Sequence, residues 1–344
     1  GRPIVLGDVK VFERAGKFVG REDIVIHRCD KVSDALFTPG TIDVLHLDLI
    51  EDINKFEMAK VSVEGGNAAF QCVKKVIELA MAGEVDATCT NALNKEAMNK
   101  ALAYYHGEKS DGYTHFDGHT EIYATYTHTK KYTMMLAHHD LRVVHVSTHV
   151  SLREACDRVK KDRVLEVIEI ADKACRDMGI AEPKIAVAGL NPHCGENGMF
   201  GTEEIEEIQP AIDAALAEGI NIPEKKPTPP DTVFSKALGC WYDIVVVMYH
   251  DQGHIPLKVK GFVYNKAEGH FLQKLHALGA YGLGHYKFHC SYSLSLLLVI
   301  RQRNGVIHGV YQAQLVGVAV ACVAEAGAVV YGGPDDRQAQ GHID

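Results

Sequence analysis

The chain has 344 residues, a formal net charge of -9 at pH 7 and nine cysteines, and its sequence pI is near 6.1. The acidic balance argues against a surface that binds nucleic acid or anionic membranes, and the absence of any C-x-x-C spacing argues against a disulfide framework or a zinc ribbon. No signal peptide is visible at the start, and apolar runs such as residues 294–300 are too short to cross a bilayer. We therefore expect a cytoplasmic protein that is large enough for two domains, or for one large α/β domain.

Helix and strand patterns alternate in the first half of the chain. Residues 70–83 have the apolar spacing of an amphipathic helix that ends at Gly83. Residues 86–90 predict a short strand. Residues 117–121, with the sequence D-G-H-T-E, predict a short loop that is rich in hydrogen-bond donors.

The alternation continues in the second half. Strands are expected at residues 141–148, 184–190 and 242–247. Between them, Ser151 and Glu154 form a capping-box pattern at the start of a helix that ends at Gly179. Residues 202–219 predict another helix, with a break at Pro210. Alternation at this spacing predicts an α/β fold with a mostly parallel sheet that is covered by helices on both faces.

A histidine follows each of these three expected strands. The residues are His149, His193 and His250. Sites in parallel sheets gather at the carboxyl ends of strands, and neutral imidazoles that converge from separate strands make a divalent-metal site with open positions for substrate. A single histidine after a strand is more often an ordinary loop or core residue. Spacing alone leaves both interpretations open.

Other polar residues of the chain, lysines and a hydroxyl group among them, indicate an anionic substrate. His119 and Thr120 lie in the D-G-H-T-E segment, Lys95 follows the expected strand at residues 86–90, and Lys258 follows His250 along the chain. Ammonium and hydroxyl groups placed in this way suit a phosphorylated small molecule. The alternative for each lysine is a solvated surface charge, and Lys258, close to the H-D-Q-G sequence, is the stronger candidate.

Five motifs carry a resemblance to a known family. They are D-G-H-T-E (117–121), H-V-S-T-H-V-S-L-R-E (145–154), G-L-N-P-H-C-G-E-N-G (189–198), P-P-D-T-V-F (229–234) and M-Y-H-D-Q-G-H-I-P-L-K (248–258). Over about residues 2–271 the chain resembles the 4-hydroxythreonine-4-phosphate dehydrogenase family of vitamin B6 synthesis. The likeness is greatest to the branch with 4-phospho-D-threonate and 4-phospho-D-erythronate dehydrogenases.

This resemblance implies a fold similar to that of isocitrate and isopropylmalate dehydrogenases. Two three-layer α/β/α domains would surround a cleft, and a homodimer would carry its active sites at the subunit interface. We expect a cofactor-side domain made of residues 1–115 and about 271–344. Residues 116–270 would then form the metal-binding and dimerisation domain.

The resemblance also implies roles for individual residues. The metal ligands would be His149, His193 and His250, and the substrate-contacting residues would be His119, Thr120 and Lys258. Our candidates for proton transfer, or for orienting other groups, are Asp251, Asp231 and Lys95.

The implied reaction needs two cofactors. A divalent metal (Zn, Mg, Mn or Co) would lower the pKa of the substrate's secondary hydroxyl, a hydride would pass to NAD or NADP, and the resulting 3-keto acid would decarboxylate. No G-x-G-x-x-G sequence follows an expected strand. The family does not use that motif, so its absence does not count against the resemblance. The cofactor-binding residues stay unassigned.

The chain departs from the family pattern in three places. The glycine-rich M-G-D-P-A-G-[IV]-G-P-E opening is missing, and Ala92 replaces the usual proline of T-N-x-L-N-K. After Phe271 the family's N-[IV]-T-x-G-L-P-x-[IV]-R-T-S-x-D-H-G-T segment is absent, and charged residues become sparse. Our interpretation is a metal- and nicotinamide-dependent dehydrogenase of a 4-phosphorylated hydroxy acid. The alternatives are a metal-dependent aldolase or isomerase of a phosphorylated sugar acid, and a catalytically impaired homologue that binds metal or phosphate.

Overall fold

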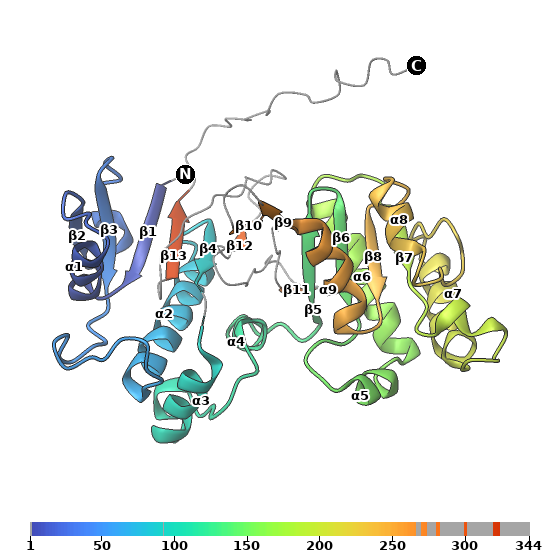
Figure 1. Cartoon of the computed structure of the whole chain (residues 1–344), viewed down its shortest axis with the longest axis horizontal. Helices are drawn as coiled ribbons and strands as arrows, with labels where there is room; N and C mark the ends of the chain where they lie inside the picture. The colour runs from blue at the N-terminus through green and yellow to red at the C-terminus, as the bar shows by residue number, and fades with distance from the viewer. Residues whose placement is uncertain are drawn as a thin grey trace, which may run out of the picture.

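Two β-sheets and the helices around them make up most of the protein (Figure 1). The structure, a computed structural model, describes residues 2–91, 93–265, 270–273, 280–282, 299–300 and 319–323. Helices and strands alternate along most of this chain, so the expected α/β class is confirmed. No helix among the described residues is both long and apolar enough to cross a membrane.

The first sheet has six strands in the order β12-β4-β13-β1-β3-β2. The strands are β1 (Arg2–Gly7), β2 (Val25–Cys29), β3 (Thr41–His46), β4 (Ala87–Thr90), β12 (Val299–Ile300) and β13 (Ala319–Val323). β1, β3 and β2 pair in parallel, whereas β13 runs antiparallel to both β1 and β4. The expected parallel pairing is therefore present in this sheet, but antiparallel strands extend it.

Helices and short turns of helix follow the strands β1 to β4 along the chain. They are α1 (Val9–Phe18), η1 (Val32–Asp34), α2 (Val63–Ala82), α3 (Lys95–Tyr104), η2 (Glu108–Ser110) and α4 (His119–Tyr126). The helix expected at residues 70–83 is confirmed as α2. It starts earlier than expected because the Ser62 hydroxyl accepts a hydrogen bond from the Gly65 N–H at 3.1 Å. It ends where Gly83 adopts a left-handed φ of 74°.

The second sheet has five strands in the order β11-β5-β6-β8-β7. The strands are β5 (Tyr132–His138), β6 (Leu141–His145), β7 (Ile185–Val187), β8 (Ile244–Val247) and β11 (Ala280–Gly282). The three strands expected in this half are confirmed as β6, β7 and β8, and they pair in parallel. β5 pairs antiparallel with β6, because the short turn between His138 and Leu141 allows only a hairpin.

The second half of the chain supplies further helical elements. They are α5 (Leu152–Asp157), α6 (Lys161–Asp177), η3 (Pro192–Glu196), η4 (Glu204–Ile208), α7 (Gln209–Ala217), α8 (Val233–Leu238) and α9 (His250–Gly261). The single helix expected from Ser151 to Gly179 is instead two helices. The chain leaves the helical path at Val159, which is fully buried, and Lys160 is extended. The expected break at Pro210 is not present. The π-helical turn η4 continues directly into α7 at Gln209, and Pro210 lies in the first turn of α7, so the helix changes type here without a gap.

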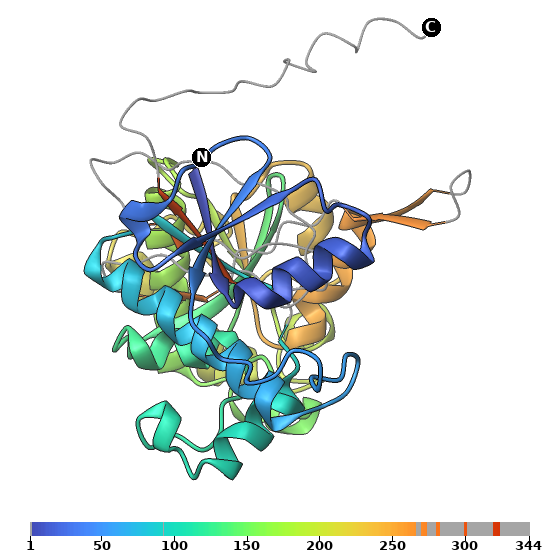
Figure 2. The same cartoon turned by 90° about the vertical axis from the view of Figure 1, so that its left-hand side faces the viewer.

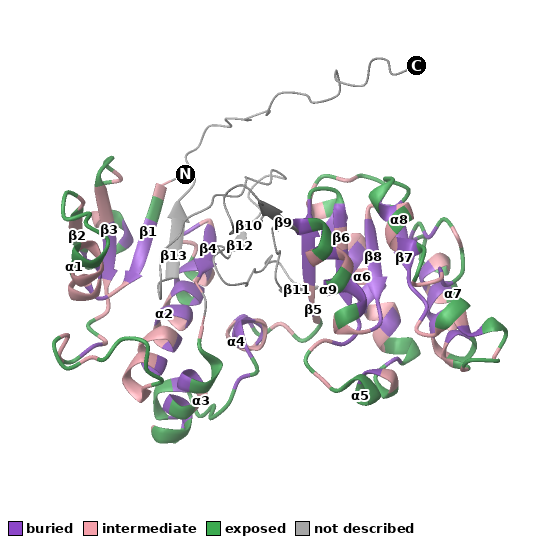
Figure 3. Cartoon of the chain, viewed as in Figure 1, coloured by how far each residue is buried: buried purple, intermediate pink, exposed green. Residues whose placement is uncertain are grey.

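One hydrophobic cluster contains residues from both sheets. Ile4 of β1 and Phe70 of α2 belong to the same buried cluster as Leu136 of β5 and Val245 of β8. A second cluster packs β6, β7 and β8 against α6 and α7. All four residues of β8 are buried (Figure 3), as expected for a central parallel strand with both faces covered.

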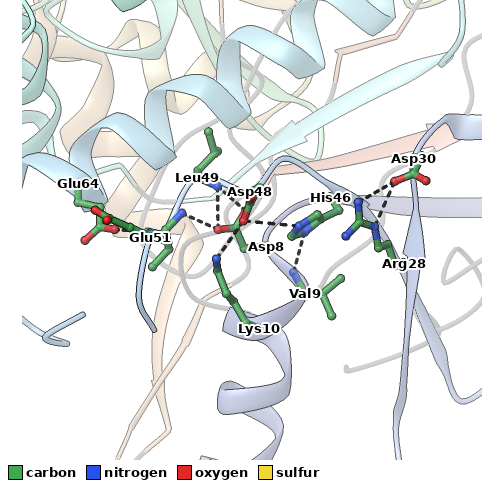
Figure 4. A network of polar contacts seen from close by, with 11 residues as sticks. Asp8, Val9, Lys10, Arg28, Asp30, His46, Asp48, Leu49, Glu51 and Glu64 are labelled. Carbon is green, nitrogen blue, oxygen red and sulfur yellow. Dashed lines mark hydrogen bonds and ion pairs between the residues drawn. The ribbon is translucent and has the colours of Figure 1, made fainter. Parts of the chain in front are cut away.

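A network of polar contacts joins the carboxyl ends of β1 and β3 (Figure 4). The carboxylate of Asp8, which follows β1, accepts hydrogen bonds from the backbone N–H groups of Leu49 at 2.8 Å and Ile50 at 2.6 Å. The ring of His46, at the end of β3, accepts one from the Val9 N–H at 3.3 Å. These bonds hold the start of α1 and the chain after β3 in place. The sequence analysis did not identify either side chain.

Five strands, β9 to β13, lie after residue 261. β9 (Phe262–Asn265) and β10 (His270–Gln273) form an antiparallel pair, which projects from the rest of the protein (orange in Figure 2). β12 and β13 belong to the first sheet and β11 to the second. Ala92 and most of residues 271–344 lie outside the described residues, and the expected domain boundaries stay a prediction.

Candidate metal and substrate site

The carboxyl ends of three parallel strands meet at one edge of the second sheet. β6 and β7 both pair in parallel with β8, and His149, His193 and His250 follow β6, β7 and β8. The topology that the metal-site prediction needs is therefore present. The roles of the three histidines as ligands stay a prediction.

Two of these histidines lie close together. The ring centroids of His149 and His250 are 5.9 Å apart. His250 begins α9, and its Nδ1 lies 2.6 Å from the Asp251 carboxylate. That acceptor holds the proton on Nδ1, so in the neutral ring Nε2 carries the lone pair. This is the contact that the expected orienting role of Asp251 requires.

The protonation state of His149 also suits metal binding. The surrounding protein partly desolvates the ring and lowers its pKa, and the nearby positive charges of Lys95 and His250 lower the pKa further. A metal binds the neutral form of imidazole. His149 therefore keeps its metal-binding form at a lower pH than an ordinary histidine does.

His193 is not part of this pair. It is exposed in the turn η3 and makes no ring contact with His149 or His250. Among the described residues, ring nitrogens of all three histidines do not lie within 4.8 Å of one another. One chain therefore brings together two of the three expected ligands.

A different group of three donors is present in the first sheet. Donor atoms of His27, Cys29 and Asp43 all lie within 4.8 Å of one another. The Asp43 carboxylate already accepts hydrogen bonds from the backbone N–H groups of Leu36 and Phe37 and from the His27 ring, at 2.8 to 3.0 Å. Burial and the charge of Asp43 raise the pKa of Cys29 to about 11. The hydrogen bonds alone explain this arrangement.

Lys95 lies next to the D-G-H-T-E segment. It begins α3, and a Cβ added to Gly118 would lie 3.5 Å from its Nζ. The segment is not the loop that we expected, because α4 begins at His119. Burial and the charge of Lys95 lower the pKa of His119 to about 4, whereas burial raises the pKa of Glu121. The structure thus gathers a cation, a neutral imidazole and a carboxyl group beside His149.

A pocket of about 540 Å³ opens between α4 and the strands β5 and β6. Thr120 and His149 line it. Its lining also contains three cationic residues that were not predicted from the sequence, Lys130, Arg158 and Arg163. The Arg163 guanidinium donates hydrogen bonds to the Val146 and Tyr132 carbonyls at 3.1 and 3.0 Å, so this side chain holds the wall of the pocket. The capping-box pattern at Ser151 and Glu154 predicted a helix in this segment, but it did not predict the contacts of Arg163.

The residues after His250 fasten α9 to the sheet. The Gln252 side chain accepts a hydrogen bond from the Met248 N–H at 2.7 Å and donates one to the Gly189 carbonyl at 2.8 Å. A Cβ added to Gly253 would lie 2.8 Å from Nε2 of His145. The H-D-Q-G sequence therefore combines an oriented imidazole, a link between two strand ends and a close approach that only glycine allows.

The other two candidate residues, Lys258 and Asp231, lie on α9 and on the loop before α8. Lys258 is half-buried on α9, on the same helix as His250, and its charge helps to lower the pKa of His254. Asp231 is exposed on the loop before α8, where its charge acts on Cys194 beside His193. Asp231 therefore accompanies His193, whereas Asp251, Lys95 and Thr120 accompany the His149–His250 pair.

Buried histidines make the stability of this region depend on pH. Burial lowers the pKa of both His119 and His145 to about 4, whereas the unfolded chain titrates near 6.5. Between these two pKa values the unfolded state therefore binds more protons than the folded state. The contribution of each histidine to the free energy of unfolding is fully present above pH 6.5 and is lost as the pH drops toward 4. We expect each residue to reduce the free energy of unfolding by about 2 kcal/mol between pH 7 and pH 5.

Urea unfolding at the two pH values measures this loss. The variant His145→Gln should show a smaller loss, and a replacement of the exposed His128 by asparagine should keep the wild-type loss. An equal free energy of unfolding at pH 7 and pH 5 in the wild-type protein would contradict the prediction.

Comparison with known proteins identifies relatives over most of the chain. Residues 1–266 match the family described as "Pyridoxal phosphate biosynthetic protein PdxA". D-threonate 4-phosphate dehydrogenases of Pectobacterium atrosepticum and Salmonella typhimurium are 43% and 42% identical over 259 residues, which cover 75% of this chain and 75% of each relative. The crystal structure of 4-hydroxythreonine-4-phosphate dehydrogenase from Klebsiella pneumoniae matches with a TM-score of 0.66 and 38% identity, covering 75% of each chain. The resemblance seen in the five motifs is confirmed.

Proposed function

The chain belongs to the family of the pyridoxal phosphate biosynthetic protein PdxA, and we propose on this basis that it is an NAD- or NADP-dependent dehydrogenase of a 4-phosphorylated hydroxy acid. The observation that carries the proposal is the identity of 43% to a D-threonate 4-phosphate dehydrogenase over 259 residues. All the candidate site residues lie within the family match at residues 1–266. Candidate substrates are 4-phospho-D-threonate, 4-phospho-D-erythronate and 4-phosphohydroxy-L-threonine, which would be oxidised and then decarboxylated.

We extend the proposal to the assembly. The fold would be that of isocitrate and isopropylmalate dehydrogenases, with two domains around a cleft, and the active form would be a homodimer. The position of His193, apart from the His149–His250 pair, supports an active site that is shared between subunits. A second copy of the chain would then supply the third imidazole.

A divalent metal fits the His149–His250 pair for two reasons. The ring of His250 is oriented by Asp251 at 2.6 Å, and the lowered pKa of His149 favours its neutral form. When bound, such a metal would act as a Lewis acid on the secondary hydroxyl oxygen of the substrate. Imidazole ligands favour Zn or Co over Mg.

Residues of the pocket, together with Lys95 at the start of α3 and His119 at the start of α4, would bind and orient the substrate. The Lys95 ammonium, which lies beside Gly118, would hold the substrate carboxylate or carry a proton on Nζ. His119 is buried and neutral, so it would offer a hydrogen bond and no charge. Thr120, in the lining of the pocket, would add a hydroxyl donor. A volume of about 540 Å³ is sufficient for a small phosphorylated acid.

Lys258 is our candidate for a charged contact with the substrate. Its replacement by alanine should remove a charge-assisted hydrogen bond of about 1.5–3 kcal/mol, and should weaken substrate binding about tenfold or more. Steady-state kinetics with the best phosphorylated acid measure the change in KM. The exposed Lys260 on the same helix provides a matched control, and Lys260→Ala should behave as wild type. Unchanged kinetics in Lys258→Ala would assign Lys258 to the solvated surface.

Reduction of NAD or NADP with the three phosphorylated acids tests the proposed function. The assay uses the full chain, after dialysis against each candidate metal. Reduction of the cofactor supports a dehydrogenase, whereas a product without reduction supports an aldolase or isomerase. Binding without turnover would indicate a catalytically impaired homologue. This last alternative is favoured by one observation, because the family's cofactor-side segment is not recognisable after Phe271.

A further inference from the structure

The loop that carries His193 has an unusual backbone. Six consecutive residues adopt a left-handed conformation: His193, Cys194, Gly195, Glu196, Asn197 and Gly198 have φ values of 51°, 55°, 78°, 44°, 54° and 92°. Four of them have a side chain, and in this conformation each Cβ lies too close to the following carbonyl oxygen. A run of this length is therefore unstable by itself, and contacts with the rest of the protein must hold it.

One buried carboxylate provides such contacts. Glu204 is only 4% exposed. Its Oε1 accepts hydrogen bonds from the backbone N–H groups of Leu190 and Asn191, both at 2.7 Å, and its Oε2 accepts one from the Asn191 side chain at 2.9 Å. These two residues immediately precede the turn with His193, so Glu204 fixes the point at which the loop leaves the sheet.

The same carboxylate also lies close to the left-handed run itself. A Cβ added to Gly195 would lie 3.0 Å from Oε2 of Glu204, and a Cβ added to Gly189 would lie 3.1 Å from Oε1. Glycine at both positions lets the backbone approach the carboxylate closely. The loop is thus packed around Glu204 on both sides of His193.

We propose that Glu204 is a positioning residue for His193, which holds the strained loop in the conformation that presents the imidazole to the metal. The proposal rests on the ligand role of His193 in the proposed function. It adds a residue outside the five motifs, which the sequence analysis did not identify.

The hydrogen-bond pattern explains why glutamine should not replace Glu204. The three donors to this side chain described above are all N–H groups, and both carboxylate oxygens accept. The amide of glutamine has one acceptor oxygen and one NH₂ donor. Its NH₂ would therefore face either the two backbone N–H groups or the amide of Asn191. In either orientation donors oppose donors, and the loop loses part of its anchor.

Metal titration of Glu204→Gln tests the proposal. Titrating the dialysed full-length protein with Co²⁺, followed by its visible absorption, gives the dissociation constant. We expect the affinity to fall about 10–100-fold, the range for residues that orient metal ligands. The control is Glu206→Gln, which removes an exposed carboxylate from the same π-helical turn and should leave the affinity unchanged. A folded Glu204→Gln protein with wild-type Co²⁺ affinity would overturn the proposal.

A second measurement separates this proposal from the proposed function. Hydrogen exchange of the Leu190 and Asn191 amides reports on the anchor without metal, and both should lose protection in Glu204→Gln. If the wild-type protein binds no metal, the proposed function fails. Independently of metal, unchanged amide protection in Glu204→Gln would overturn the anchoring role of Glu204. If Glu204→Gln does not fold, Glu204→Asp keeps the charge on a shorter side chain. It should show a smaller loss of Co²⁺ affinity, and wild-type affinity in this variant would contradict the proposal.

Discussion

Replacing any one of His149, His193 and His250 with alanine should abolish tight binding of the divalent metal and reduce turnover to background. With three protein ligands, a catalytic site has no spare donor, so the affinity should fall by more than the 10–100-fold that is typical of supporting residues. Metal content after dialysis and NAD(P) reduction measure the two effects. The exposed His128, which has a φ of 55°, is a suitable control, because asparagine tolerates this conformation. Wild-type metal content in all three variants would show that the site is elsewhere.

Mixing two of these variants tests whether the site is shared between subunits. In the proposed dimer, His149 and His250 of one subunit would join His193 of the partner subunit. A heterodimer of His193→Ala and His250→Ala chains would then contain one intact site and one doubly altered site. Since random exchange makes about half of the dimers mixed, about a quarter of the wild-type activity should return. If all three ligands came from one chain, no mixture would recover activity.

Replacing Lys95 with methionine should reduce kcat about 10²–10⁴-fold, the contribution expected of a group that transfers a proton. Methionine keeps much of the length of the side chain and removes only the ammonium, which lies beside Gly118. A matched control is Lys100→Met on the same helix, because Lys100 forms a surface ion pair with Glu96 at 2.6 Å, and such pairs contribute little. Equal kcat values for both variants would remove Lys95 from the catalytic residues.

The same variant should change the titration of a neighbouring imidazole. The positive charge of Lys95 disfavours protonation of His149, so the pKa of His149 should rise when the charge is removed. NMR titration of the metal-free protein measures this shift. An unchanged pKa of His149 would show that Lys95 does not act on this ring.

Much of the secondary structure followed from local patterns. The apolar spacing and Gly83 predicted α2, and the β-branched run before Tyr249 predicted β8. These features depend on the neighbouring residues along the chain, because caps, periodicity and proline geometry act over one or two turns. The family was also recognised from the order of short motifs.

Other features depended on contacts between distant residues. The break between α5 and α6 arises where Val159 is buried in the core, and α4 begins at His119 although its sequence predicts a loop. The first sheet contains antiparallel strands because β12 and β13, from far along the chain, join β4 and β1. Such pairings are non-local, so no short sequence pattern specifies them.

The sequence by itself determined which residues are candidates for chemistry in this protein. It placed His149, His193 and His250 after three strands and Asp251 beside His250, since the order along the chain defines these neighbours. Only the tertiary structure decided which of them meet. It brought the ring centroids of His149 and His250 to 5.9 Å from each other and Lys95 beside Gly118. It left His193 on a separate loop. The physical reason is that packing across the sheet sets both the spacing of the strand ends and the path of each loop.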